Sequence, residues 1–277
     1  MGSFLDLFRI RISLMVGLST FAGACLSSSN LQYSHLYIVL GALFLSAGVS
    51  ALNQYQERVE DGLMKRTNNR PIPSGMISPK SALIVSSVLI IISICFIMLT
   101  GSLEALGLAC ATIVIYNFIY TPLKKKTPFA LLAGSVTGAI PPMLGFTALG
   151  GSMSSPDILT VCAIMYIWQT PHFAMLAEKY SEDYIKAGFK TLSLIYGNSA
   201  ALLFIIIWVS AFISSLFFVP VAGLYTLQTS AMIHTILAVL TTLMLLVFYK
   251  SSTKVFHILN LSMVLFFLLL VVDRIII

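Results

Sequence analysis

Nine long apolar runs are the feature that most constrains the fold of this chain. Eight of them have the ~17 to 25 residues that a helix needs to cross a hydrocarbon core of ~30 Å, and the fourth is slightly short. The runs lie near residues 11–28, 36–54, 82–101, 104–119, 129–148, 157–177, 197–219, 229–249 and 256–273. Hydrophobic residues make up 58% of the chain and charged residues only 9%, which excludes an ordinary soluble domain. Because continuous apolar runs favour helices over a closed barrel, we expect an all-α polytopic membrane protein with about nine transmembrane helices.

The basic residues predict the orientation of these helices. Lys and Arg in short loops stay on the cytoplasmic side of a membrane. With the N-terminus inside, every loop with several basic residues falls on the inner side, and Arg274 is the one basic residue left outside. We therefore expect a cytoplasmic N-terminus and, as the simplest location, the inner membrane of a bacterium. The net charge of +6 indicates topology and contact with anionic lipid headgroups, and no nucleic-acid partner is expected.

Three oxygen-bearing side chains lie at the end of the second run. Asn53, Glu57 and Asp61 recur every four residues, so on a helix they share one face. Mg²⁺ prefers oxygen ligands and is usually held by one or two carboxylates together with the phosphates of its substrate. We therefore assign these three residues to a metal site that serves catalysis.

Basic residues follow this triplet at once. Lys65, Arg66 and Arg70 would supply the positive charge that a diphosphate requires. Charged residues at a helix end also mark the headgroup zone, and for single residues such as Glu60 that simpler interpretation is favoured. For the triplet and its trailing basic residues we favour a diphosphate site, because a solvated face does not need three oxygen ligands in register.

A second long polar loop, residues 178–196, follows the sixth run. It contains Glu178 and Asp183, and its Lys190-Thr191 pair echoes Arg66-Thr67 of the first loop. We expect Glu178 and Asp183 to hold a second metal ion or to orient the basic loop, with Asp183 as the further candidate metal ligand. The echo suggests a single domain over residues 1–277 with a weak internal repeat, roughly 11–128 and 129–277.

Other residues complete the candidate site. Lys124 begins a lysine triplet that either anchors the inner side or attracts an anionic substrate, and with Lys190 it is a candidate diphosphate ligand. Glycines and Pro141-Pro142 in the fifth run predict an irregular helix that permits close approach of a neighbour or a bend beside a cavity. His172, which follows Pro171, is either a hydrogen-bonded structural residue or a group that binds haem iron or assists proton transfer.

Four segments resemble those of the protohaem IX farnesyltransferases, or haem O synthases, among the UbiA-type intramembrane prenyltransferases, and the resemblance covers essentially the whole chain. They are NQYQERVEDGLMKRTNNRPIPSG, YTPLKKKTP, GAIPPMLGFTA and WQTPHFAMLAEKYSEDYIKAGFKTLSL. Glu57 stands where most relatives carry Asp, and the second loop lacks a regular DxxxD motif. The WQTPHF segment separates this branch from the quinone and chlorophyll prenyltransferases, whose corresponding helix usually carries Asp at or near the position of His172.

The resemblance implies nine helices around a central cavity with a polar cap on the cytoplasmic side. It implies transfer of a farnesyl group from farnesyl diphosphate to haem B, with Mg²⁺ as cofactor and with His172 and Trp168 in contact with haem. The lipid bilayer surrounds the enzyme, and haem A synthase or cytochrome oxidase assembly factors are candidate partners for the lipophilic product.

Two other functions fit parts of the sequence. A sister prenyltransferase acting on an aromatic acid or quinone precursor would share the diphosphate site, but the WQTPHF segment argues against it. A non-enzymatic transporter is the least favoured, because transporters concentrate polar groups near the midplane. Here the charged groups lie at the inner helix ends.

Overall fold

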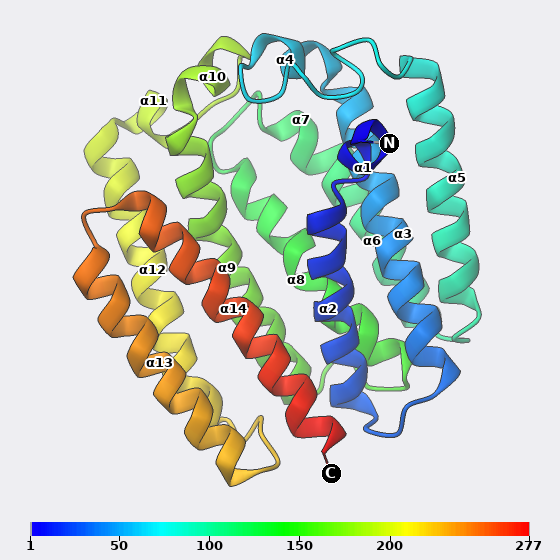
Figure 1. The fold of residues 1–277 in the computed structure, drawn as a ribbon, viewed down its shortest axis with the longest axis vertical. Coiled ribbons are helices and arrows are strands. Elements are labelled where there is room, and N and C mark those ends of the chain that lie inside the picture. The colour runs from blue at the N-terminus through cyan, green and yellow to red at the C-terminus, as the bar shows by residue number, and fades with distance from the viewer. Residues whose placement is uncertain (1, 277) are drawn as a thin grey trace.

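The computed structural model describes residues 2–276, and within them the chain is helical with no strand (Figure 1). Among these residues, nine helices are long and apolar enough to span a membrane. They are α2 (Ile10–Ser27), α3 (Tyr33–Gln56), α5 (Pro79–Met98), the run Leu103–Leu123, α8 (Ala130–Ala148), α9 (Pro156–Lys179), α12 (Asn198–Val221), α13 (Gln228–Phe248) and α14 (Ser252–Ile275). Shorter helices are α1 (Gly2–Leu7), α4 (Arg58–Leu63), α10 (Ser181–Lys186) and α11 (Leu192–Tyr196). The number of spans and the all-α class predicted from the apolar runs are confirmed.

The fourth span is longer than its apolar run indicates. It comprises α6 (Leu103–Ile113), a π-helical segment η1 (Val114–Tyr120) and α7 (Thr121–Leu123). The last two contain polar residues, so apolar content alone ends the span too early. Single-turn π-bulges within α-helices occur often at functional sites. The fully buried Asn117 of η1 donates through Nδ2 to the backbone oxygen of Val49 in α3 at 3.1 Å.

The spans form a ring that closes on itself. Following the chain, α3 packs on α5, α8 packs on both α6 and α9, and α9 packs on α12. The ring is completed by α12 on α13, α13 on α14, and α14 on α2. Figure 1 shows the spans running side by side, with α12, α13 and α14 on one side and α3, α5 and α6 on the other. A central space is thereby enclosed by helices from both halves of the chain.

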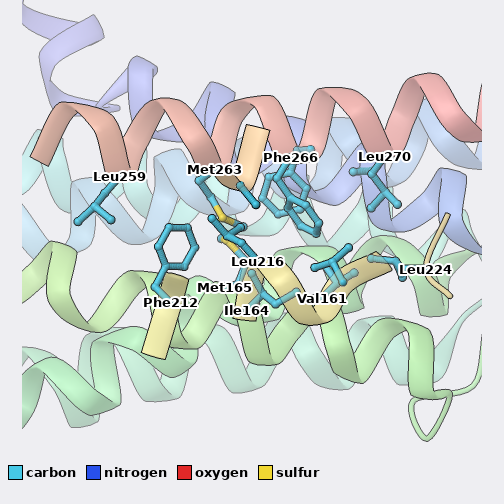
Figure 2. Packing of buried hydrophobic residues seen from close by; sticks show 14 of the residues in the cluster. Val161, Ile164, Met165, Phe212, Leu216, Leu224, Leu259, Met263, Phe266 and Leu270 are labelled. Atoms are coloured by element: carbon cyan, nitrogen blue, oxygen red, sulfur yellow. The ribbon is translucent and has the colours of Figure 1, made fainter. Parts of the chain in front are cut away.

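The largest apolar core lies between α9, α12 and α14. Figure 2 shows its buried side chains interlocking: Val161, Ile164, Met165, Phe212, Leu216, Leu224, Leu259, Met263, Phe266 and Leu270. Only 17% of the α12 window and 22% of the α13 window is buried, although both helices are strongly apolar. Apolar side chains left on the outside of a membrane protein face lipid, so α12 and α13 line the outer wall of the ring.

Helices α2 and α8 approach each other through glycines. A Cβ atom on Gly145 would lie 1.9 Å from the backbone oxygen of Thr20, and one on Gly23 would lie 1.9 Å from that of Pro142. Backbones that are this close leave no room for any side chain, as is typical of small-residue contacts between membrane helices. The close approach expected from the irregular fifth run is therefore present, with α2 as the partner.

Replacing Gly145 with Ala is expected to lower the Tm of the detergent-solubilised protein, because α2 and α8 must move apart. Overpacking of this kind typically costs about 1–3 kcal/mol. Gly107→Ala in α6 is the matched control, since nothing lies within 4 Å of its added Cβ. Thermal unfolding followed by fluorescence or light scattering checks both. An unchanged Tm for Gly145→Ala would contradict the described packing.

One end of the ring carries a polar cap. Figure 1 shows α4, α7, α10 and α11 gathered at the end where the chain begins, whereas the C-terminal end of α14 lies at the opposite end. The two long loops meet there: Met64 of the first packs on Ala187 and Phe189 of the second. The backbone N–H of Lys190 also donates to the carbonyl oxygen of Lys124 at 3.0 Å. The cap thus joins segments far apart in the sequence over the central space.

Candidate active site

A cavity of about 1190 Å³ occupies the centre of the ring. Its cap end is lined by charged and amide side chains, and its interior by apolar and aromatic ones. A single concave site with a few convergent polar groups and an apolar wall is typical of a site for a large, mainly apolar ligand. The polar end contains the predicted triplet: Asn53, Glu57 and Asp61 all line the cavity.

The triplet keeps its register although the helix does not continue unbroken. Helix α3 ends at Gln56, and Glu57 has φ −98° and ψ 16° before α4 begins. The N–H of Glu57 still donates to the carbonyl oxygen of Asn53 (2.9 Å), and that of Asp61 donates to Glu57 (2.7 Å). Helix α3 ends where the Gln56 amide exchanges hydrogen bonds with Asn117 of η1. The expectation of one continuous helix was wrong in this detail, whereas the spacing of four correctly placed all three side chains on the cavity.

Both carboxylates of the triplet face cations. Asp61 is fully buried, and Nη1 of Arg70 lies 2.7 Å from each of its oxygens. Glu57 is 4% exposed and forms an ion pair with Lys124. The paired atom is Oε1, which has no other polar partner among the described residues. A metal ion that binds this oxygen would therefore take the place of the Lys124 ammonium.

Asn53 has a cation of its own. Nη2 of Arg9 donates to its Oδ1 at 3.0 Å, and the other terminal nitrogen of Arg9 donates to the Tyr116 hydroxyl at 3.1 Å. The Nδ2 of Asn53 donates to Oγ1 of Thr121 (3.0 Å), which itself donates to the backbone oxygen of Tyr116 (2.9 Å). Because Thr121 can only accept from Asn53, the amide oxygen of Asn53 must face Arg9 and the cavity.

Arg9 is held by a strained backbone. It has φ 46° and ψ 53°, and no other non-glycine residue in 2–276 has a positive φ. Gln54, fully buried in α3, donates to the carbonyl oxygens of Asp6 and Leu7 and so fixes the end of α1 just before this residue. Such strain costs ~1–3 kcal/mol and persists where the surroundings impose it, frequently at functional sites. The sequence pattern indicated Arg9 only as one of the basic residues on the inner side, and its place in the site was not predicted.

The charge balance at this end is positive. Burial lowers the pKa of Arg9, but the attraction of Tyr116, Asp61 and Glu57 outweighs it, so the net shift is upward. Burial and the neighbouring charge of Arg9 lower the pKa of Arg70, an effect that Asp61 partly opposes. Arg9, Arg70 and Lys124 each face one residue of the triplet, and these three cations meet only two carboxylates. An incoming anion would therefore be favoured.

Arg9→Met is expected to raise the KM for the diphosphate substrate more than it lowers kcat, since one positive charge leaves the polar end. A charged hydrogen bond of this kind contributes about 1.5–3 kcal/mol, or roughly 10- to 150-fold. Steady-state kinetics over a range of substrate concentrations checks it. Arg58→Met is the control, because Arg58 is exposed and does not line the cavity. Equal kinetics for the two variants would remove Arg9 from the site.

The remaining predicted residues divide between the cavity and the cap. Arg66, Lys190 and Glu178 line the cavity, while Lys65 and Asp183 are not among its lining residues. An oxygen of Asp183 accepts the backbone N–H of Arg66 at 3.1 Å, so this carboxylate ties the second loop to the first. Glu178 similarly accepts from the backbone N–H of Ser193 at 3.2 Å. In the structure the second-loop carboxylates hold the cap together.

An aromatic wall leads from the polar end into the cavity. The ring of Tyr116 lies 5.5 Å from that of Tyr120, which stacks on Phe173 at 6.0 Å, and Phe173 lies 5.7 Å from His172. The Nζ of Lys124 lies 4.8 Å from the centre of the Tyr120 ring. Aromatic faces attract cations within about 6 Å. The wall can therefore stabilise a positive charge that develops beside the polar end.

The other end of the wall is built around His172. Trp168, predicted as its neighbour, lies 5.0 Å away between ring centres, and its Nε1 donates to the backbone oxygen of Leu259 at 2.9 Å. The Nδ1 of His172 lies 2.9 Å from Oδ1 of Asn260 in α14. Sequence analysis missed Asn260, although a polar residue in the middle of an apolar span is a signal of function. The two predicted haem contacts thus lie together on the wall of the cavity.

The whole chain matches a known family and a known fold. The model of the UbiA prenyltransferase family matches residues 16–271, and the chain belongs to this family. Solved structures with the same fold include a UbiA homologue from Aeropyrum pernix, with a TM-score of 0.77 and 18% identity over 96% of this chain and 98% of that one. A UbiA homologue from Archaeoglobus fulgidus bound to GPP and Mg²⁺ has a TM-score of 0.74 and 16% identity over 99% of this chain and all of that one.

Closer relatives in sequence are protohaem IX farnesyltransferases. The enzyme of Oleidesulfovibrio alaskensis is 34% identical over 272 residues, which make up 98% of this chain and 96% of the relative. That of Nitratidesulfovibrio vulgaris is 38% identical over 216 residues, 77% of this chain and 75% of the relative. The resemblance to this branch drawn from the motifs is confirmed, and the chain is a membrane-embedded prenyltransferase.

Proposed function

We propose that this chain transfers the farnesyl group of farnesyl diphosphate to the 2-vinyl group of haem B, giving haem O and diphosphate. The observation that carries the proposal is one cavity with a cationic end at the triplet and an aromatic end at His172. The identity of 34% to a protohaem IX farnesyltransferase along nearly the whole chain supports the same acceptor.

The chemistry begins with cleavage of the bond between farnesyl C1 and the diphosphate oxygen. The electron pair leaves with diphosphate, and the allylic cation is attacked by the terminal carbon of the vinyl group. Water then adds to the remaining vinyl carbon, which has become cationic, and releases one proton. The net result is a hydroxyethyl carbon that carries the farnesyl chain.

The residues that line the polar end of the cavity have different roles in cleavage of the carbon–oxygen bond. Arg9, Arg66, Arg70, Lys124 and Lys190 bind the diphosphate oxygens and stabilise the charge that grows on them as the bond breaks. Tyr120 and Phe173 face the forming cation, and the apolar cavity keeps water away until the new carbon bond has formed. Lys65 is exposed on the cap and does not line the cavity, so it contributes only to the positive electrostatic potential that attracts diphosphate.

Asn53, Glu57 and Asp61 would hold Mg²⁺, and their donor set fits this ion: one amide oxygen and two carboxylates, all three on the wall of the cavity. Bound there, the ion neutralises diphosphate and makes it a better leaving group. With a metal ion on the triplet, Arg9, Arg70 and Lys124 would be released from Asn53, Asp61 and Glu57 and could bind the phosphates. Asp183 and Glu178 are proposed either as ligands of a second ion or as residues that stabilise the cap. Their hydrogen bonds to the backbone N–H groups of Arg66 and Ser193 favour the second role.

The location proposed for this enzyme is a bacterial inner membrane, with the N-terminus and the cap in the cytoplasm. Basic residues concentrate in the loops of the cap, as the positive-inside rule requires. Farnesyl diphosphate would then enter from the cytoplasmic side, where the cap lies. Haem A synthase or oxidase assembly factors remain proposed recipients of the lipophilic product.

Competition between acceptors tests the proposed reaction. The purified protein in detergent receives farnesyl diphosphate, Mg²⁺ and equal amounts of haem B and a 4-hydroxybenzoate or quinone precursor, and the extracts are analysed by chromatography and mass spectrometry. A farnesylated, hydrated haem with the phenolic acceptor unchanged is the expected product. Prenylation of the aromatic acceptor with unchanged haem would assign the chain to a sister activity.

A further inference from the structure

Asn260 has an amide whose orientation the structure determines. Its Nδ2 donates to the backbone oxygen of Phe256, one helical turn earlier in α14, at 2.8 Å. Reversing the amide would point Oδ1 at that carbonyl oxygen and lose the bond, since neither atom can donate. The amide oxygen therefore faces His172, whose Nδ1 lies 2.9 Å away.

This orientation sets the tautomer of His172. An amide oxygen can only accept, so Nδ1 of His172 must carry the proton that it donates. In the neutral imidazole the lone pair then resides on Nε2, for which no partner occurs among the described residues. The ring centre of His172 lies 5.0 Å from that of Trp168 and 4.8 Å from that of Phe256. These three side chains and Asn260 all line the cavity.

We propose that Asn260 is a positioning residue that keeps Nε2 of His172 unprotonated as the axial ligand of the haem iron. The inference rests on the proposed function and deepens it, because it states how the acceptor is held. Histidines that ligate metals commonly donate their second ring N–H to an acceptor that fixes tautomer and ring orientation. Asn260 occupies that place on the helix opposite His172.

The chemistry of this end of the cavity favours an iron porphyrin over a bare ion. Within residues 2–276 no group of three or more His, Cys, Asp or Glu side chains could hold a metal ion. A single imidazole suffices for haem iron, which brings four nitrogen ligands of its own. The flanking Trp168, Phe256 and Met263 provide the apolar surface that a porphyrin face contacts.

The test compares binding of two porphyrins to the full-length protein in detergent. Haem B and iron-free protoporphyrin IX are titrated separately, by absorbance and fluorescence. Asn260→Leu is expected to weaken haem B binding by about 10- to 100-fold, the usual effect of removing such a partner, and to leave protoporphyrin IX binding unchanged. Asn260→Asp keeps the acceptor, so it should restore haem affinity and raise the iron–histidine stretching frequency in the resonance Raman spectrum of the ferrous complex.

Two further variants calibrate the result. His172→Ala should abolish the histidine-ligated spectrum. His257→Ala should not change it, because His257 is an exposed histidine of α14 that does not line the cavity. Equal losses for both porphyrins in Asn260→Leu would show a purely structural role and overturn the inference. So would a haem spectrum that survives His172→Ala. If either occurred while wild-type protein still farnesylated haem B, the proposed function would stand and the role of Asn260 would fall.

Discussion

Glu57→Gln is expected to lower kcat for farnesyl transfer by about 100- to 1,000-fold, the range found when one electrostatic stabiliser of a transition state is removed. Gln keeps the size of the side chain but loses the charge that would hold the cation next to the diphosphate. The ion pair with Lys124 is also lost, and Lys124 then faces the cavity without a partner. Because the polar end of the cavity admits a charged substrate, we expect the protein to remain folded.

Glu60→Gln is the matched control for this variant. Glu60 lies one helical turn from Glu57 and also pairs with a lysine, Lys125, but it does not line the cavity. The lysine of this second pair is half exposed, at 51%, and exposed ion pairs contribute little. Release of diphosphate, measured for both variants at saturating substrates, decides the question. Comparable rates in the two variants would remove Glu57 from the metal site.

Arg70→Leu is expected to destabilise the protein by about 3–5 kcal/mol, the usual cost of removing one partner of a buried ion pair. Asp61 is fully buried, and Arg70 provides a contact to both of its oxygens. Without it the negative charge of Asp61 stays buried without its ion-pair partner. The variant should show a clearly lower Tm in detergent, together with a raised KM for farnesyl diphosphate.

The double variant Arg70→Leu with Asp61→Asn separates stability from activity. Removing the charge of Asp61 relieves the uncompensated carboxylate, so much of the lost Tm should return. Activity should not return, because both the cation and a proposed metal ligand are then absent. A Tm that stays as low as in Arg70→Leu would show that Arg70 stabilises the cap through other contacts.

Periodicity along the sequence predicted the features that depend on neighbours in the chain. Length and apolar content placed the spans, and a spacing of four placed Asn53, Glu57 and Asp61 on the cavity. The weak internal repeat stays a prediction. The fourth span continues past the predicted end at residue 119 through α7, where Thr121 and Pro122 interrupt the apolar run. A helix packed against protein can carry such polar groups inside a membrane.

Contacts between distant parts of the chain were beyond such analysis. Arg9 reaches Asn53 across 44 residues, and His172 reaches Asn260 across 88. No local pattern selects one arginine before the first span or one asparagine in the last. Asp183 was assigned to metal from its residue type, whereas its position at the backbone of Arg66 follows from how the two loops meet.

The central claim is that one cavity holds diphosphate at the triplet and haem at His172. Its most direct test is an experimental structure of the complex with Mg²⁺, a non-reactive thio analogue of farnesyl diphosphate and haem B. We expect the phosphates beside Asn53, Glu57 and Asp61, the iron on Nε2 of His172, and the farnesyl chain along the aromatic wall. Haem bound outside the cavity, or phosphates away from the triplet, would contradict the account.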